Sequence, residues 1–119
     1  MSWNVIVVDE LRDWLHELRG EDRETLRLIS AAIDILASQG PTLGRPLVDS
    51  ITRSEIKNLK ELRPGSSGNS EVRILFAFDP IRQAVLLVGG DKAGNWQGWY
   101  DEAIPVAEER FRAHVEGQK

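Results

Sequence analysis

The 119-residue sequence predicts an α+β domain: an N-terminal strand and a helical hairpin packed on a small, mainly antiparallel sheet, followed by a C-terminal helix. Three observations predict this class. Apolar residues recur at helical spacing between residues 11 and 36, two sets of side chains alternate over residues 72–78, and strand-like segments follow one another in the second half. The length is typical of one domain, spanning residues 1–119.

The first half predicts one strand and two antiparallel helices. Residues 3–8 are rich in β-branched and aromatic types, so we expect them to open the sheet. A helix should begin at Asp9, a residue type that caps helices, and end at Gly20. A second helical pattern runs from Leu26 to Leu36 and stops at Gly40-Pro41.

The second half predicts three consecutive antiparallel strands. Residues 41–55 resemble a loop, and residues 56–63 resemble a strand that stops at Pro64. The alternation over residues 72–78 should place one set of side chains in the core and the other, which includes Arg73, on the opposite face. Residues 84–88 form an apolar run suited to a central strand.

Two further segments complete the expected chain. Gly89 and Gly90 suggest that the backbone leaves the sheet there, so that Lys92 would lie in a loop. A final helix is expected from Ile104 onward, with Pro105 tolerated only in its first turn.

The composition excludes several classes of function. Without cysteine the chain has no disulfide, thiolate metal site or cysteine nucleophile, and a reducing cytoplasm fits best. The first residues, from Met1, do not resemble a signal peptide, and no apolar run approaches the roughly 20 residues of a membrane span. The glycines do not form a phosphate loop, which argues against an NTPase, and we expect neither a metal nor a cofactor.

The charge is unevenly distributed. The net charge is -4, but residues 1–50 carry -4, residues 51–100 carry +2 and residues 101–119 carry -2. A basic stretch from Lys57 to Lys92 within an acidic chain is compatible with a confined phosphate site. Ordinary solvated surface charge is the alternative.

The strand patterns bring a candidate site together. On an extended strand Lys57, Glu61 and Arg63 share one side, whereas Lys60 projects to the other. Antiparallel pairing with residues 72–78 would bring Arg73 to the same end. Lys92 follows the third strand. Cations beside aromatic side chains suit a nucleotide, and the candidate RNA-binding residues are Lys57, Lys60, Trp96 and Trp99. The alternatives are a surface ion pair between Glu61 and Arg63 and a packing role for the two tryptophans.

These residue types fit RNA cleavage by the 2′-hydroxyl of the substrate. Arg63 and Arg73 would stabilise charge on the phosphoryl oxygens, because guanidinium groups bind phosphate in a bidentate manner. Glu61 is the candidate base, Lys92 could assist or act as acid, and Tyr100 could donate a proton or stack on a base. Such chemistry requires no metal.

Several motifs, in this order, resemble RelE/HigB-type toxins of bacterial type II toxin-antitoxin systems, within the RelE/ParE superfamily. They are Leu-Lys-Glu-Leu-Arg at residues 59–63, Val-Arg-Ile-Leu-Phe-Ala-Phe-Asp-Pro at 72–80, Val-Leu-Leu-Val-Gly-Gly-Asp-Lys at 85–92, and Tyr100. The resemblance implies a RelE-like microbial RNase-type fold and an mRNA interferase: an endoribonuclease that cleaves mRNA on the ribosome and inhibits translation. The matching site positions are Arg63, Arg73 and Lys92, with Tyr100 a weaker match.

The resemblance also implies partners and alternatives. A cognate antitoxin, usually of the helix-turn-helix type, would hold the toxin inactive. The toxin would contact DNA only indirectly, through the antitoxin, and we expect no membrane partner. Glu61 stands where relatives would carry a second cation. A ParE-like, non-enzymatic toxin that binds DNA gyrase is therefore the alternative, and an inactive antitoxin-bound regulator is a third.

Overall fold

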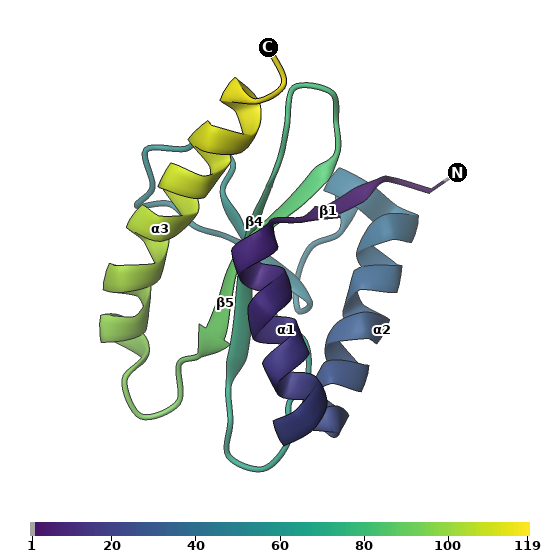
Figure 1. The fold of residues 1–119 in the computed structure, drawn as a ribbon, viewed down its shortest axis with the longest axis vertical. Helices are drawn as coiled ribbons and strands as arrows, with labels where there is room; N and C mark the ends of the chain where they lie inside the picture. Colours follow the sequence, from purple (N-terminus) through teal and green to yellow (C-terminus); the bar gives the residue numbers. More distant parts are fainter. Residues whose placement is uncertain (1) are drawn as a thin grey trace.

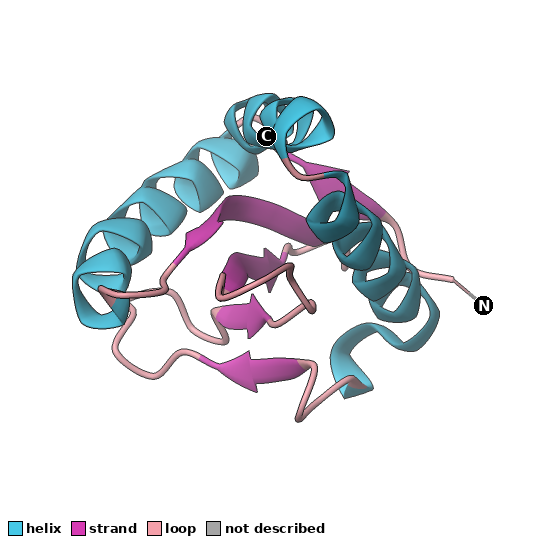
Figure 2. Ribbon diagram, turned by 90° about the horizontal axis from the view of Figure 1, so that it is seen from below, coloured by secondary structure: helices cyan, strands magenta, loops and turns pink. Residues whose placement is uncertain are grey.

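Five strands form one sheet, and three helices cover its two faces (Figures 1 and 2). The computed structural model describes residues 2–119, so Met1 lies outside the described residues. In chain order the elements are β1 (Val5–Val7), α1 (Asp9–Glu21), α2 (Arg23–Gln39), a short 3-10 helix η1 (Gly40–Thr42), β2 (Val48–Ser50), β3 (Lys60–Leu62), β4 (Val72–Phe78), β5 (Ala84–Asp91) and α3 (Trp96–Glu116).

The strand order is β1-β5-β4-β3-β2. Strand β1 pairs in parallel with β5, and the other three pairings are antiparallel. The expected fold is confirmed: an N-terminal strand, a helical hairpin, a mainly antiparallel sheet and a C-terminal helix. None of the helices in residues 2–119 is both long and apolar enough to cross a membrane.

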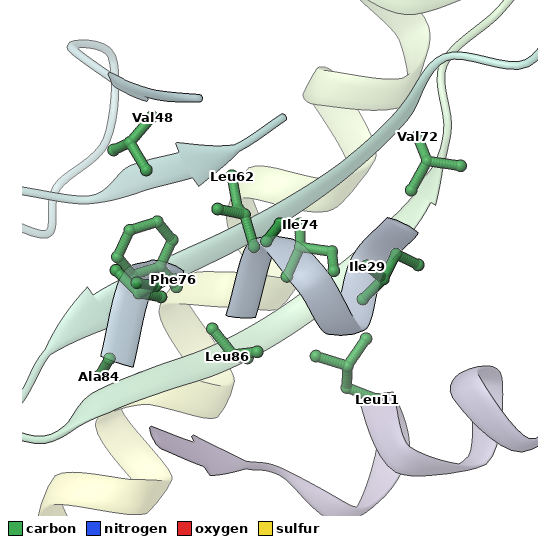
Figure 3. Close-up of a cluster of buried hydrophobic side chains, with 11 residues drawn as sticks. Leu11, Ile29, Val48, Leu62, Val72, Ile74, Phe76, Ala84 and Leu86 are labelled. Atoms are coloured by element: carbon green, nitrogen blue, oxygen red, sulfur yellow. The ribbon is translucent and has the colours of Figure 1, made fainter. Parts of the chain in front are cut away.

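The sheet has a separate hydrophobic core on each face. Figure 3 shows the core beneath α1 and α2, where Leu11 and Ile29 meet side chains of the sheet such as Ile74 and Phe76. The second core packs α3 onto the other face through the buried residues Leu59, Leu75, Ala77, Val85, Leu87, Ala103, Ile104 and Ala107. The alternation over β4 correctly separated the two sets of side chains, but only one set was expected in a core, whereas the other set is also buried apart from Arg73.

The ends of the first helix differ from the prediction. Val8 occupies the N-cap position, and Asp9 lies in the first turn. Gly20 does not end the helix, which continues to Glu21. Asp22 separates the two helices because its carboxylate accepts hydrogen bonds from the Thr25 amide (3.1 Å) and hydroxyl (2.6 Å), which cap α2.

Two predictions about the middle of the chain were wrong. Residues 41–55 are not all loop, because they contain the edge strand β2, which is too short to show a periodic pattern. The strand expected over residues 56–63 is reduced to β3. Asn58 has a φ of 65°, which turns the chain just before that strand begins.

The two glycines of β5 do not end the strand, which continues to Asp91. Glycine is required at both positions because tryptophan rings pack directly against the strand. A Cβ atom at Gly89 would lie 2.6 Å from the Trp14 ring, and one at Gly90 would lie 2.4 Å from Nε1 of Trp99. The predicted end of the strand was too early, because glycine here accommodates tryptophans from both helical layers, whereas Lys92 does lie in the loop that follows β5.

Helix α3 begins at Trp96, eight residues before the expected start. Pro105 therefore lies inside the helix rather than in its first turn. Its side chain is exposed, so water can reach the backbone carbonyl that the proline leaves without an N–H donor. This earlier start places Trp96 and Tyr100 above the sheet.

Candidate active site

A cavity of about 520 Å³ lies between the β2–β3 edge of the sheet and the first turns of α3. We call it the Glu61 cavity. It is lined by Asp49, Ser50, Ile51, Thr52, Arg53, Glu61, Arg63, Lys92, Trp96, Gln97, Tyr100 and Ile104.

Glu61 is the centre of the polar network and is only 4% exposed. Tyr100 donates its hydroxyl proton to Oε1 of Glu61 (2.5 Å), and Nη2 of Arg63 donates to Oε2 (3.1 Å). Nε of Arg73 lies 3.6 Å from Oε1. A carboxylate this deeply buried requires such partners, because desolvation of a charge costs several kcal/mol.

Strand pairing explains how these residues meet. Glu61 lies opposite Leu75, and Leu62 lies opposite Ile74, so the same register brings Arg73 toward the end of β3 that carries Arg63. Alternation turns Glu61, Arg63 and Arg73 to the face covered by α3. The convergence predicted from the sequence is thus present in the structure.

Asp49 is a site residue that the sequence did not reveal. It lies opposite Glu61 in the pairing of β2 with β3, and its Oδ2 accepts from Nη2 of Arg63 (3.0 Å) and of Arg45 (2.9 Å). The hydrogen bond from Arg45, followed by that from the Ser50 amide, lowers the pKa of Asp49 to about 2. Asp49 lay in the predicted loop, where no pattern could have paired it with Glu61.

The rim of the cavity is formed by Lys92 and two aromatic rings. Nζ of Lys92 lies 3.1 Å from a carboxylate oxygen of Glu71 and 5.7 Å and 6.0 Å from the ring centroids of Trp96 and Tyr100. Trp96 is 59% exposed, so its ring is available for stacking. Trp99 lines the second core instead, where it packs against Gly90.

Tyr100 is held in its protonated form. Burial raises the pKa of its phenol far above the ordinary value, and the hydrogen bond to Glu61 and the charge of that carboxylate raise it further. A neutral phenol can donate one proton and still accept another through its oxygen.

Lys57 and Lys60 are not brought to this cavity. They line a second cavity together with Arg82, because Lys60 points to the face opposite Glu61. Of the nine predicted site residues, five line the Glu61 cavity, Arg73 contacts Glu61 without lining the cavity, and Trp99, Lys57 and Lys60 lie elsewhere. Among residues 2–119, no three His, Asp or Glu side chains form a group that could hold a metal ion.

Comparisons with known proteins give a consistent result. The family model described as "Phage derived protein Gp49-like" matches residues 10–112. HigB2 of Mycobacterium tuberculosis, named as a candidate toxin, is 56% identical over 108 residues, which are 91% of this chain and 52% of HigB2. HigB3 of the same organism, named in the same way, is 50% identical over 106 residues, which are 89% of this chain and 88% of HigB3. The chain thus spans about half the length of HigB2, and no solved structure gives a significant match.

Proposed function

Because the chain belongs to the Gp49-like family and to the HigB-type toxins of toxin-antitoxin systems, we propose that it is an endoribonuclease that cleaves mRNA on the ribosome. One observation carries the proposal: a buried Glu61 bound to a protonated Tyr100, with Arg63 and Arg73 beside it, at the wall of an open cavity. The partner that controls it would be a cognate antitoxin.

The network supplies a route for the first proton. The substrate 2′-hydroxyl attacks the adjacent phosphorus, and its proton passes to the Tyr100 oxygen while the phenol proton passes to Glu61. This forms a 2′,3′-cyclic phosphate and breaks the bond from phosphorus to the 5′-oxygen. Lys92, on the same rim, would protonate the departing 5′-oxygen.

The two arginines would stabilise the charge that develops on the phosphoryl oxygens. The Nε–H groups of Arg63 and Arg73 are buried and have no hydrogen-bond acceptor within residues 2–119. An unpaired buried donor costs about 1–3 kcal/mol. Arg63 lines the cavity and Arg73 lies directly beside Glu61, so a phosphate bound there would meet unused donor capacity, which supports their assignment to the phosphate.

The test is to induce the protein in cells and map RNA 5′ ends, with and without active translation. New 5′-hydroxyl ends within translated mRNA, absent when translation is blocked, would support the proposal. Inhibited DNA supercoiling with unchanged RNA ends would instead show a ParE-like toxin. Harmless expression in the absence of an antitoxin would indicate a regulator without toxic activity.

A further inference from the structure

A second cavity, of about 370 Å³, opens on the face of the sheet opposite the Glu61 cavity. We call it the Lys60 groove; it is lined by Pro41, Lys57, Asn58, Lys60, Phe78 and Arg82. Three of its six lining residues are cationic and none is acidic. Lys60 and Glu61 are neighbours on β3, so alternation alone separates the two sites.

The cations of the groove have no counter-charge. Within residues 2–119, no carboxylate lies within 4.0 Å of the charged groups of Lys57, Lys60 or Arg82. By contrast, the cations in and beneath the Glu61 cavity are all paired: Arg53 with Asp101, Arg63 with Asp49 and Glu61, Arg73 with Glu61, and Lys92 with Glu71. The groove is therefore the site with charge available for an anionic ligand.

The backbone holds Arg82 in an unusual conformation. Its φ is 67°, which is uncommon for a residue with a side chain of this size, and its amide donates to the Asp79 carbonyl (2.8 Å). The guanidinium carbon lies 4.9 Å from the centroid of the Trp3 ring. The Arg82 side chain is exposed, and its guanidinium rests on the Trp3 ring beside the groove.

The aromatic support under Arg82 is closely packed. The Trp3 ring meets Phe78 edge-on with centroids 6.0 Å apart, and a Cβ atom at Gly40 would lie 2.3 Å from that ring. Aromatic surface beside cations is the combination that binds the bases and phosphates of RNA.

We infer that the Lys60 groove binds the phosphodiester backbone of RNA at a point separate from the bond that is cleaved. The inference rests on the proposed function in taking RNA as the ligand, and it deepens that proposal. The Glu61 cavity has little net charge with which to attract RNA, whereas electrostatic attraction supplies most non-specific affinity for nucleic acids. The groove supplies that attraction from the opposite face, on either the substrate strand or a structured segment of the ribosome.

The test compares two triple variants of the full chain with the same change in charge. The first is Lys57→Gln, Lys60→Gln and Arg82→Asn; asparagine is chosen because it tolerates a positive φ. The control is Arg19→Gln, Arg23→Gln and Arg27→Gln, which removes three exposed arginines from α1 and α2. Thermal unfolding of each variant serves to check that both are folded.

Binding is measured with fluorescent 2′-O-methyl RNA, as a single strand and as a hairpin duplex, over a range of salt concentrations. This RNA cannot be cleaved, so the result does not depend on catalysis. We expect the groove variant to lose about tenfold or more in affinity at low salt and the log-log salt slope for the single strand to fall by about 2, from three phosphates at about 0.7 each. Loss with the single strand assigns the groove to the substrate, and loss with the hairpin assigns it to structured RNA.

Three results would overturn the inference. Affinity and salt slope could be unchanged for both RNAs, or the control variant could lose as much as the groove variant. Alternatively, poly-glutamate of matched charge could bind the wild type as tightly as RNA and lose affinity equally in the groove variant, which would make the groove a site for acidic peptides.

Discussion

The Glu61 cavity and the Lys60 groove lie on opposite faces of the same three-residue strand and differ in how their charges are arranged. In the cavity the cations are held by carboxylates, and in the groove no carboxylate of residues 2–119 holds them. Paired charges have fixed positions but exert little attraction at a distance, whereas unpaired charges attract but are less ordered. The comparison teaches that pairing divides the two faces as the two proposals require, with fixed charges for chemistry on one face and available charges for affinity on the other.

Arg73→Ala should produce the largest difference between the two regions. Removing a group that stabilises transition-state charge typically costs 10²–10³ in kcat, and we expect about 10³ with loss of growth inhibition. The measurement is mapping of RNA 5′ ends after induction. Arg19→Ala, at an exposed position on α1, is the matched control, and full toxicity with unchanged RNA ends in the Arg73 variant would remove Arg73 from the site.

Tyr100→Phe should lower kcat by about 10², which is the lower end of the range for general acid-base catalysis. The ring and its contacts with Trp96 and Trp99 are retained, so KM should change little. Steady-state kinetics with a translated reporter mRNA separates the two constants. An unchanged kcat would show that Glu61 accepts the proton without Tyr100.

Arg63→Gln and Lys60→Gln test the comparison through stability. The first leaves Asp49 and Glu61 short of donors, which should cost about 1–3 kcal/mol and lower Tm by about 4 °C per kcal/mol. The second removes an unpaired charge three residues earlier in the chain and should change stability by less than about 0.5 kcal/mol. Equal shifts in thermal unfolding would contradict the contrast between paired and unpaired cations.

Asp49 should give the smallest effect, in acid. Its folded pKa of about 2 lies below its ordinary value of 3.8, so the ionised form stabilises the fold above about pH 4, and that contribution is lost as pH falls toward about 2. Asp49→Asn should therefore lose less Tm than the wild type between about pH 4 and about pH 2. Parallel curves for the two proteins over that interval would show that Asp49 is not held in this way.

The parts of the site predicted from the sequence are those fixed by local periodicity. Alternation along β3 and β4 placed Glu61, Arg63 and Arg73 on one face, because successive side chains of a strand point in opposite directions. The same rule separates Lys60 from Glu61. Lys57 was expected beside Glu61 because the strand was predicted to start too early, and the turn at Asn58 directs Lys57 to the groove instead.

The parts that were not predicted depend on contacts between distant residues. Asp49 enters the site because β2 adds to the edge of β3, and Arg82 enters the groove because Trp3 supports its guanidinium. Pro105 was expected in the first turn of a helix, yet α3 already begins at Trp96. The helix tolerates the proline because Pro105 is exposed, so water can reach the carbonyl one turn earlier that lacks an N–H donor. The apolar face of the helix meanwhile remains buried.

By itself, then, the sequence determined the fold class and the shared face of Glu61, Arg63 and Arg73, since hydrophobic period and strand alternation are local properties of the chain. The family came from the resemblance of its motifs, which the family model and the relatives bear out. Only the tertiary structure decided which charges are paired and which are free. Whether a cation is paired depends on its distance from a carboxylate that is often far away in the sequence. The cations of the stretch from Lys57 to Lys92 are therefore divided between a paired set on one face of the sheet and an unpaired set on the other.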